Sequence, residues 1–235
     1  MTGQPFRILF AIFPGMTQLD FTGPHQFLSR LPESEVIVAS PAGGDVPSEG
    51  LVFAGAVPIA EVAACDLLCV PGGMAATKVA LDAAFIAEIR RLAAGARYVT
   101  SVCTGSLILG AAGLLQGRRA ACHWAWRELL PVFGAIPDGA RVVRDGNVIT
   151  GGGVTAGIDF ALVVLAEVAG RNVAEAVQLG LEYAPEPPFE SGRPELADPA
   201  IVAAVRARLD RFAADRRAAA AEAAARFKSA ADQDA

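Results

Sequence analysis

The stretch from Arg97 to Gly110 constrains the fold of this chain most, because it joins a strand to a helix with no turn sequence between them. It reads RYVTSVCTGSLILG. The first half, Tyr98 to Val102, has the aromatic and β-branched composition of a strand. The run that follows Cys103 suits a helix. The strand must therefore pass into the helix at Cys103 itself.

Small residues stand two positions before and two positions after this cysteine, in the order Ser101-Val102-Cys103-Thr104-Gly105. Such a pattern is typical of a nucleophile elbow, where bulky side chains would clash between strand and helix. A thiol at a helix N-terminus meets free N–H groups and a helix dipole that favour its anion. The pKa of a cysteine in such a site falls from about 8.5 to roughly 3.5–7.5. We therefore predict that Cys103 is a thiolate nucleophile; the alternative is a buried apolar cysteine.

Composition narrows the class of protein. The chain has 235 residues, of which 53% are hydrophobic and 19% charged, and this suits an α/β domain with a sizeable core. A net charge of −5 without a basic block argues against a nucleic-acid binder. The short N-terminal apolar run is interrupted by Pro14 and Gly15, so we expect neither a signal peptide nor a membrane span, and a cytoplasmic location with reduced cysteines. The spacing of Cys and His predicts no structural metal site.

Apolar runs separated by turn residues predict strands that alternate with helices. Strands are predicted at 6–13, 35–40, 66–70, 98–102 and near 120–122, with a strand or hairpin at 51–57 and a hairpin at 142–150. Helices are predicted from about 20 to 31, and at 85–94, 104–112, 123–130, 155–169 and 172–181, with one helical turn at 60–64. This order predicts a doubly wound, mostly parallel sheet with helices on both faces.

The C-terminal part differs in composition from the rest. Residues 185–199 are rich in proline and predict a connector, and residues 201–227 are rich in alanine. Val202, Val205 and Leu209 share one face of that second run, which predicts a helix that docks through its first half and then frays. We therefore divide the chain into an α/β domain, residues 1–190, and a tail, residues 191–235, packed on the same domain or on a dimer partner.

Two further segments are expected beside the elbow, because ligands bind at the carboxyl edge of an open α/β sheet. Asp20 follows the first strand and is a candidate acid/base, or else a helix N-cap. The sequence Pro71-Gly72-Gly73 follows another strand, and glycine lets backbone N–H groups approach a ligand closely. Gly72, Gly73 and Met74 are therefore candidate wall residues and oxyanion donors; the alternative is a tight turn that binds nothing.

These features resemble the ThiJ/PfpI superfamily of flavodoxin-like proteins. The matching elements are the 71–73 loop, the 102–105 elbow and the acidic residue after the first strand, and the resemblance covers most of residues 5–190. Within the superfamily, the chain closely resembles the isocyanide hydratases, which convert R–N≡C to an N-substituted formamide. That similarity is carried by residues 18–25, 98–119, 141–160 and 181–185.

The resemblance implies a role for three side chains. Cys103 is the implied nucleophile, Asp20 the implied acid/base partner, and the Thr104 hydroxyl is implied to lie near the reacting group. The chemistry suits them, because a thiolate can add to the electrophilic carbon of an isocyanide and a carboxylic acid can protonate that carbon. The product is a thioimidate at Cys103, which water then hydrolyses. A thiolate nearby would raise the pKa of Asp20, and the two groups would titrate together.

The resemblance also implies a reaction class, a substrate and an oligomeric state. It implies a carbon–nitrogen lyase that acts on a small-molecule isocyanide, needs no metal or organic cofactor and forms a homodimer. His123 lies at a position where some superfamily members place a histidine near the thiol, but we interpret the His123-Trp124 pair as structural. Trp124, Ile149 and Phe189 are candidate wall residues of the pocket by position alone.

The alternatives to isocyanide hydration are a glyoxalase or deglycase activity and a sensor function. A glyoxalase or deglycase of the superfamily usually carries His after the cysteine and Glu as its acid, where this chain has Thr104 and Asp20. A redox or ligand sensor acting through Cys103 is the other rival. Regulators of this superfamily carry a DNA-binding helical domain beyond the α/β domain, whereas an alanine-rich run without a helix-turn-helix pattern follows Pro199 here.

Overall fold

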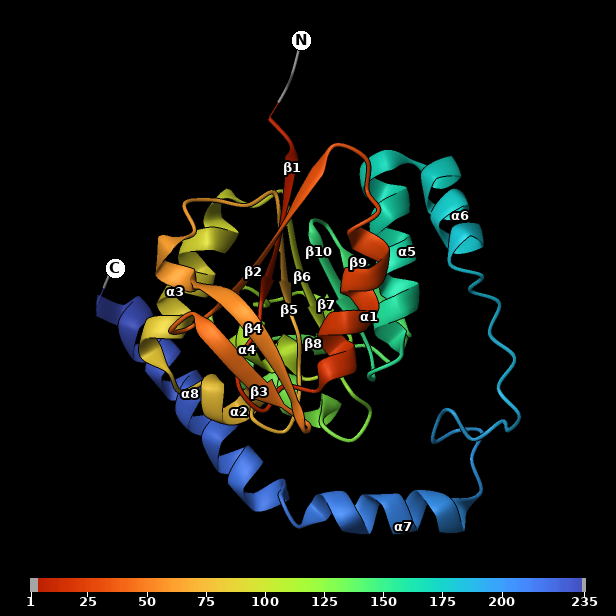
Figure 1. The fold of residues 1–235 in the computed structure, drawn as a ribbon. Helices are drawn as coiled ribbons and strands as arrows, with labels where there is room; N and C mark the ends of the chain where they lie inside the picture. Colours follow the sequence, from red (N-terminus) through yellow and green to blue (C-terminus); the bar gives the residue numbers. More distant parts are fainter. Residues whose placement is uncertain (1–3, 234–235) are drawn as a thin grey trace.

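A sheet of eight strands forms the centre of the computed structural model, which describes residues 4–233, with side chains to residue 227 (Figure 1). The strand order is β3-β4-β2-β1-β5-β6-β10-β9. The inner strands are parallel, and the pairs at each edge, β3 with β4 and β9 with β10, are antiparallel. The predicted doubly wound, mostly parallel sheet is confirmed. The strands are β1 (Phe6–Ala11), β2 (Ser34–Ser40), β3 (Gly44–Ser48), β4 (Leu51–Pro58), β5 (Leu67–Val70), β6 (Tyr98–Val102), β9 (Val142–Asp145) and β10 (Val148–Gly151).

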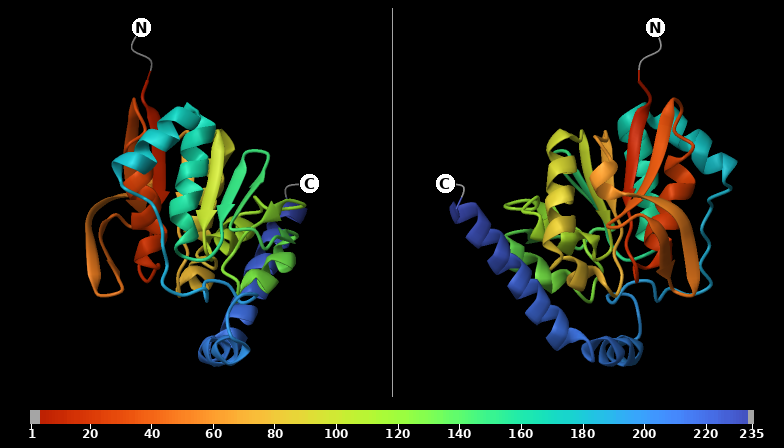
Figure 2. Two further views of the ribbon diagram at one scale, coloured as in Figure 1. Left: turned by 90° about the vertical axis from the view of Figure 1, so that its right-hand side faces the viewer. Right: turned by 60° about the vertical axis from the view of Figure 1, so that its left-hand side comes forward.

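Helices cover both faces of this sheet (Figures 1 and 2). The strand at the centre of the sheet, β5, is therefore buried along its whole length, as expected for a parallel strand covered on both faces. The apolar stripe of α3 packs inward through Phe85, Ile89 and Leu92. One face carries α1 (Gln18–Leu28), α5 (Ala156–Ala169) and α6 (Arg171–Gly180), and the other carries α2 (Ala76–Val79), α3 (Ala83–Gly95) and α4 (Gly105–Ala111).

The segment after His123 differs from its prediction. A helix was expected over residues 123–130, but the chain makes a turn first and then the 3-10 helix η2 (Arg127–Phe133). His123 Nδ1 accepts a hydrogen bond from the Ala125 N–H (3.3 Å), which stabilises the turn. Pro131 lies inside η2, where its missing N–H disfavours a regular α-helix. The remaining short elements are η1 (Ile59–Glu61), β7 (Arg119–Ala120) and β8 (Ile136–Pro137).

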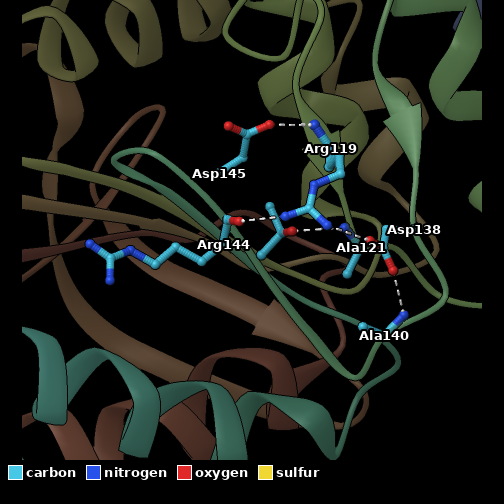
Figure 3. Close-up of polar contacts among 7 residues, drawn as sticks. Arg119, Ala121, Asp138, Ala140, Arg144 and Asp145 are labelled. Atoms are coloured by element: carbon cyan, nitrogen blue, oxygen red, sulfur yellow. Dashed lines mark hydrogen bonds and ion pairs between the residues drawn. The ribbon is translucent and has the colours of Figure 1, made fainter.

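Hydrogen bonds attach the segment before this turn to the β9–β10 hairpin (Figure 3). The Arg119 N–H donates to Asp145 Oδ2 (2.8 Å), and the Ala121 N–H donates to Thr150 Oγ1 (2.7 Å). Thr150 is fully buried, so the second bond is protected from water. The chain therefore reaches Cys122 in a fixed position beside the carboxyl end of the sheet.

The C-terminal tail docks in the opposite order to the prediction. Helix α7 (Pro199–Asp210) has no buried residue, whereas α8 (Ala213–Gln233) packs against α2, α4 and η2. The reason is the size of alanine, since a helix face of small side chains can approach its neighbours closely. Larger apolar side chains of α7, such as Ile201, stay exposed. In Figures 1 and 2, α8 runs along the side of the domain and α7 lies beyond the carboxyl edge of the sheet. The buried alanines of α8 are Ala213, Ala220, Ala223 and Ala224.

We predict that Ala220→Asp destabilises the protein, because Ala220 is 0% exposed and the new carboxylate would be buried without a partner. The expected loss is about 2 kcal/mol or more of unfolding free energy, measured by chemical denaturation. Ala218→Asp is the matched control, because Ala218 is exposed on the same helix. Equal stability of the two variants would contradict the docking of α8.

Candidate active site

Cys103 forms the junction between β6 and α4 that the sequence predicts. Its φ of +59° lies in the left-handed region, which costs a residue other than glycine on the order of 1–3 kcal/mol. Two hydrogen bonds hold this conformation. The Cys103 N–H donates to the Gly151 carbonyl (3.1 Å), and the Cys103 carbonyl accepts from Ser106 Oγ (3.2 Å). The predicted elbow is confirmed.

Close packing explains the glycines around the elbow. A Cβ at Gly105 would lie 2.9 Å from the Pro71 carbonyl oxygen and would clash with the Val70 carbonyl as well. A Cβ at Gly72 would lie 2.6 Å from Thr104 Oγ1. These distances are below any normal carbon contact, so the 71–73 loop can rest on the elbow only because both positions lack a side chain.

Asp20 lies beneath this loop and is 0% exposed. Its Oδ2 accepts a hydrogen bond from the Gly72 N–H (3.0 Å), while its buried Oδ1 has no hydrogen-bond partner among the described residues. Asp20 is in the first turn of α1, whose N-cap is Thr17, so the alternative of an N-cap aspartate is wrong. A buried carboxyl with one unused oxygen is suited to carrying a proton.

The pKa of Asp20 is raised from 3.8 to about 7. Burial is the main cause, and the Cys103 and Gly72 hydrogen-bonding groups act in the opposite direction. The predicted direction is confirmed, but the predicted cause is wrong, because burial raises this pKa and Cys103 lowers it. A carboxyl with this pKa can both donate and accept a proton near neutral pH.

The pKa of the Cys103 thiol changes in the direction opposite to the prediction. Burial, followed by the charge of Asp20, raises it well above its ordinary value, although the Thr104 N–H lowers it. Cys103 is only 4% exposed, so the desolvation of the anion outweighs the stabilisation by the helix N-terminus. The thiol therefore holds its proton in this closed site, and forming the thiolate requires a base.

The Thr104 hydroxyl links the elbow to the glycine loop. It accepts a hydrogen bond from the Gly73 N–H (2.9 Å) and lies within hydrogen-bond distance of the Gly73 carbonyl (3.1 Å). The Gly72 N–H is bonded to Asp20, so both loop N–H groups contact side chains of the candidate site. Met74, in contrast, is 49% exposed. The structure thus brings Asp20, Gly72, Gly73 and Thr104 together around Cys103.

Arg216 is a residue of this site that the sequence reasoning missed. It comes from α8 and is 3% exposed. Its Nη2 donates to the carbonyls of Gly73 (3.1 Å) and Met74 (3.0 Å), and its guanidinium carbon lies 4.3 Å from the centre of the Trp126 ring. In the sequence it is one arginine of an alanine-rich, charged run. Only the docking of α8 distinguishes it from its exposed neighbours.

A cavity of about 240 Å³ lies beside Cys122 and the loop that follows β10, and neither Cys103 nor Asp20 is among the residues that line it. His123 and Trp124 line it; burial, followed by the charge of Arg216, lowers the pKa of His123 to about 4, so its imidazole is neutral. Of the other candidate wall residues, Ile149 is buried within β10 and Phe189 is 78% exposed, and neither lines this cavity. The lining comes from residues 122–124, 127, 139–141, 152–156 and 192–195.

Within the described part of the chain, no cluster of three or more His, Cys, Asp or Glu side chains is arranged to hold a metal ion. No helix among residues 4–233 combines the length and the apolar character needed to cross a membrane. Cys65, Cys69, Cys103 and Cys122 are all buried free thiols.

The chain belongs to the DJ-1/PfpI family, whose model matches residues 6–167. It is 51% identical over 203 residues to the isonitrile hydratase of Pseudomonas putida, covering 86% of this chain and 89% of that one. The crystal structure of a ThiJ/PfpI family protein from Pseudomonas syringae superposes with a TM-score of 0.89 at 40% identity, covering 92% and 90% of the two chains. The HTH-type transcriptional regulator GlxA of Rhizobium meliloti is 30% identical over 155 residues, which span 64% of this chain and 47% of that regulator.

The raised pKa of Asp20 predicts how stability depends on pH. Between the ordinary value of 3.8 and about 7, the folded protein binds a proton that the unfolded chain releases. Stability should therefore fall as pH rises through this window, by on the order of a few kcal/mol. Asp20→Asn should lose this dependence, while the exposed control Asp45→Asn should keep it. Denaturant unfolding at several pH values measures the difference, and parallel profiles for all three proteins would refute the raised pKa.

Proposed function

We propose that this protein is an isocyanide hydratase, which converts R–N≡C and water to R–NH–CHO. The observation that carries the proposal is the buried pair of Cys103, on the elbow, and Asp20, whose carboxyl titrates near neutral pH. The extensive similarity to the isonitrile hydratase of Pseudomonas putida supports the same substrate class.

In the first proposed step, Cys103 adds to the substrate. The Asp20 carboxylate accepts the thiol proton as sulfur bonds to the terminal carbon of the isocyanide. Asp20 then delivers that proton to the same carbon, which produces the thioimidate S–CH=N–R and leaves Asp20 as a carboxylate. A pKa of about 7 suits this role, because the group accepts and donates with similar ease.

In the second proposed step, water hydrolyses the thioimidate. Water adds to the carbon, and one of its protons passes through Asp20 to the nitrogen. The carbon–sulfur bond of the tetrahedral intermediate then breaks and releases the formamide. The other water proton remains on the Cys103–Asp20 pair, which returns to its starting state. All protons are supplied by water and these two residues, so the proposed reaction uses no cofactor.

The remaining site residues have proposed supporting roles. Thr104 and Gly73 hold the loop on the elbow, and Gly72 orients the carboxyl of Asp20. Met74 is a wall residue at the exposed side of the loop. We also propose that the protein is a cytoplasmic homodimer. The exposed apolar side chains of Ile201 and Val205 in α7, and of Phe212 between α7 and α8, support the dimer.

A second candidate is a redox or ligand sensor that uses Cys103. The similarity of about two thirds of this chain to part of a transcriptional regulator favours it. The two candidates differ in stoichiometry, since a sensor reacts once per Cys103 and an enzyme turns over. A glyoxalase activity would instead appear as turnover of methylglyoxal.

We predict that the purified protein converts para-nitrophenyl isocyanide to its formamide and that Cys103→Ala abolishes this turnover, because no covalent intermediate can form. Formamide production, followed by chromatography, measures the reaction. Cys65→Ala is the matched control: Cys65 is also buried, but it precedes β5 and lies at the opposite edge of the sheet. Turnover by Cys103→Ala at the control's rate would refute covalent catalysis.

We predict that Asp20→Asn lowers kcat at least about 100-fold and changes KM much less, because an amide can accept the Gly72 hydrogen bond but cannot transfer a proton. Steady-state kinetics with the same substrate separate the two constants. An unchanged kcat would remove Asp20 from the mechanism.

A further inference from the structure

The Arg216 side chain connects the C-terminal helix to two loops of the candidate site. Its Nη2 binds the Gly73 carbonyl, the same carbonyl that lies 3.1 Å from Thr104 Oγ1, and Thr104 directly follows Cys103. Its other contact, the face of Trp126, lies in the turn after Cys122. A single cation thus reaches both segments that flank the nucleophile.

The charge of Arg216 lacks a counter-ion. Its Nε and Nη1 are buried with no hydrogen-bond partner, and no carboxylate in the described part of the chain forms an ion pair with it. Other arginines of α8 are paired on the surface, Arg217 with Glu128 and Arg226 with Glu222. A buried, unpaired cation costs several kcal/mol, and an apolar side chain of the same size would pack there at less cost. A contribution to stability therefore does not explain why this buried position carries an arginine.

The thiols near the guanidinium of Arg216 indicate which group can act as its counter-ion. Burial lowers the pKa of Arg216, whereas Cys103 and then Cys122 act to raise it. A thiolate at Cys103 would thus stabilise the buried cation, and the cation would stabilise the thiolate by the same free energy. Asp20 and Arg127 are the other charged groups that act on these two cysteines, and Glu49 acts on Asp20. The Arg216 charge also acts on His123, whose backbone N–H contacts Cys122.

We propose that Arg216 is a positioning residue of the thiol site, a cation that α8 brings in to hold the 72–74 loop on the elbow and to stabilise negative charge on the sulfur of Cys103. This charge develops when the sulfur attacks the isocyanide and again when it leaves the tetrahedral intermediate. The reaction itself rests on the proposed function, but the charge on Cys103 can be measured without any isocyanide. Burial and the charge of Asp20 raise the pKa of Cys103, and removal of the Arg216 charge should raise it further.

The test measures the ionisation of Cys103 directly. Alkylation by iodoacetamide is followed from pH 6 to 10 by mass spectrometry of the peptide that contains Cys103, because only the thiolate reacts. Arg216→Met should raise the midpoint by about one pH unit or more and slow alkylation about tenfold below it. Arg217→Met, which removes a neighbouring surface arginine, should follow the wild type. An unchanged midpoint in Arg216→Met would overturn the proposal.

Thermal stability separates this role from a purely structural one. Arg216→Met should keep or raise the melting temperature, because it removes an unpaired buried charge, while kcat for isocyanide hydration falls. A structural role predicts a lower melting temperature with an unchanged alkylation midpoint. If Arg216→Met does not fold, Arg216→Lys and Arg216→Gln replace it in the alkylation experiment. The lysine variant, which keeps the charge, should have a lower alkylation midpoint than the glutamine variant. Equal midpoints would overturn the proposal. A shifted midpoint in a protein without isocyanide turnover would refute the proposed function and leave this inference standing.

Discussion

The left-handed backbone at Cys103 is the constraint on which the rest of the site depends. It reverses the chain from β6 into α4 within one residue, and the hydrogen bond to the Gly151 carbonyl holds that reversal. Because strand and helix are then so close, the neighbouring loop must carry glycine at its contact with the elbow. The same loop positions Asp20 through the Gly72 N–H. One strained residue thereby sets the position of Cys103 and, through the glycine loop, of Asp20.

The electrostatics of the site follow from how deeply it is buried. A helix N-terminus favours a thiolate by a modest amount, whereas desolvation of a fully enclosed anion costs more, so the pKa of Cys103 rises. Asp20 experiences the same burial, and its pKa rises to about 7. Both groups therefore hold their protons to higher pH than the same groups do in water. The cation of Arg216 is held on the 72–74 loop by the Gly73 and Met74 carbonyls, and Cys103 is one of the groups that raise its pKa.

Much of this arrangement was predictable from local sequence. The elbow, the parallel strands and the small residues at positions 101 and 105 all follow from steric rules that act over a few residues. The prediction for residues 123–130 was wrong because a side chain and a proline disrupted a helix that composition favoured. The prediction for the tail was wrong because hydropathy underrates alanine, which packs by its small size and not by its apolar area.

The α/β fold, the strand-to-helix junction at Cys103 and the place of Asp20 after the first strand could all be predicted from the sequence, because each depends on short-range backbone geometry and on the rule that parallel strands end at one edge. The raised pKa of the thiol and the burial of Arg216 beside the 72–74 loop could not. Both depend on burial, and burial depends on how distant segments pack. A charged residue more than a hundred positions from Cys103 enters the site only because α8 docks beside α4.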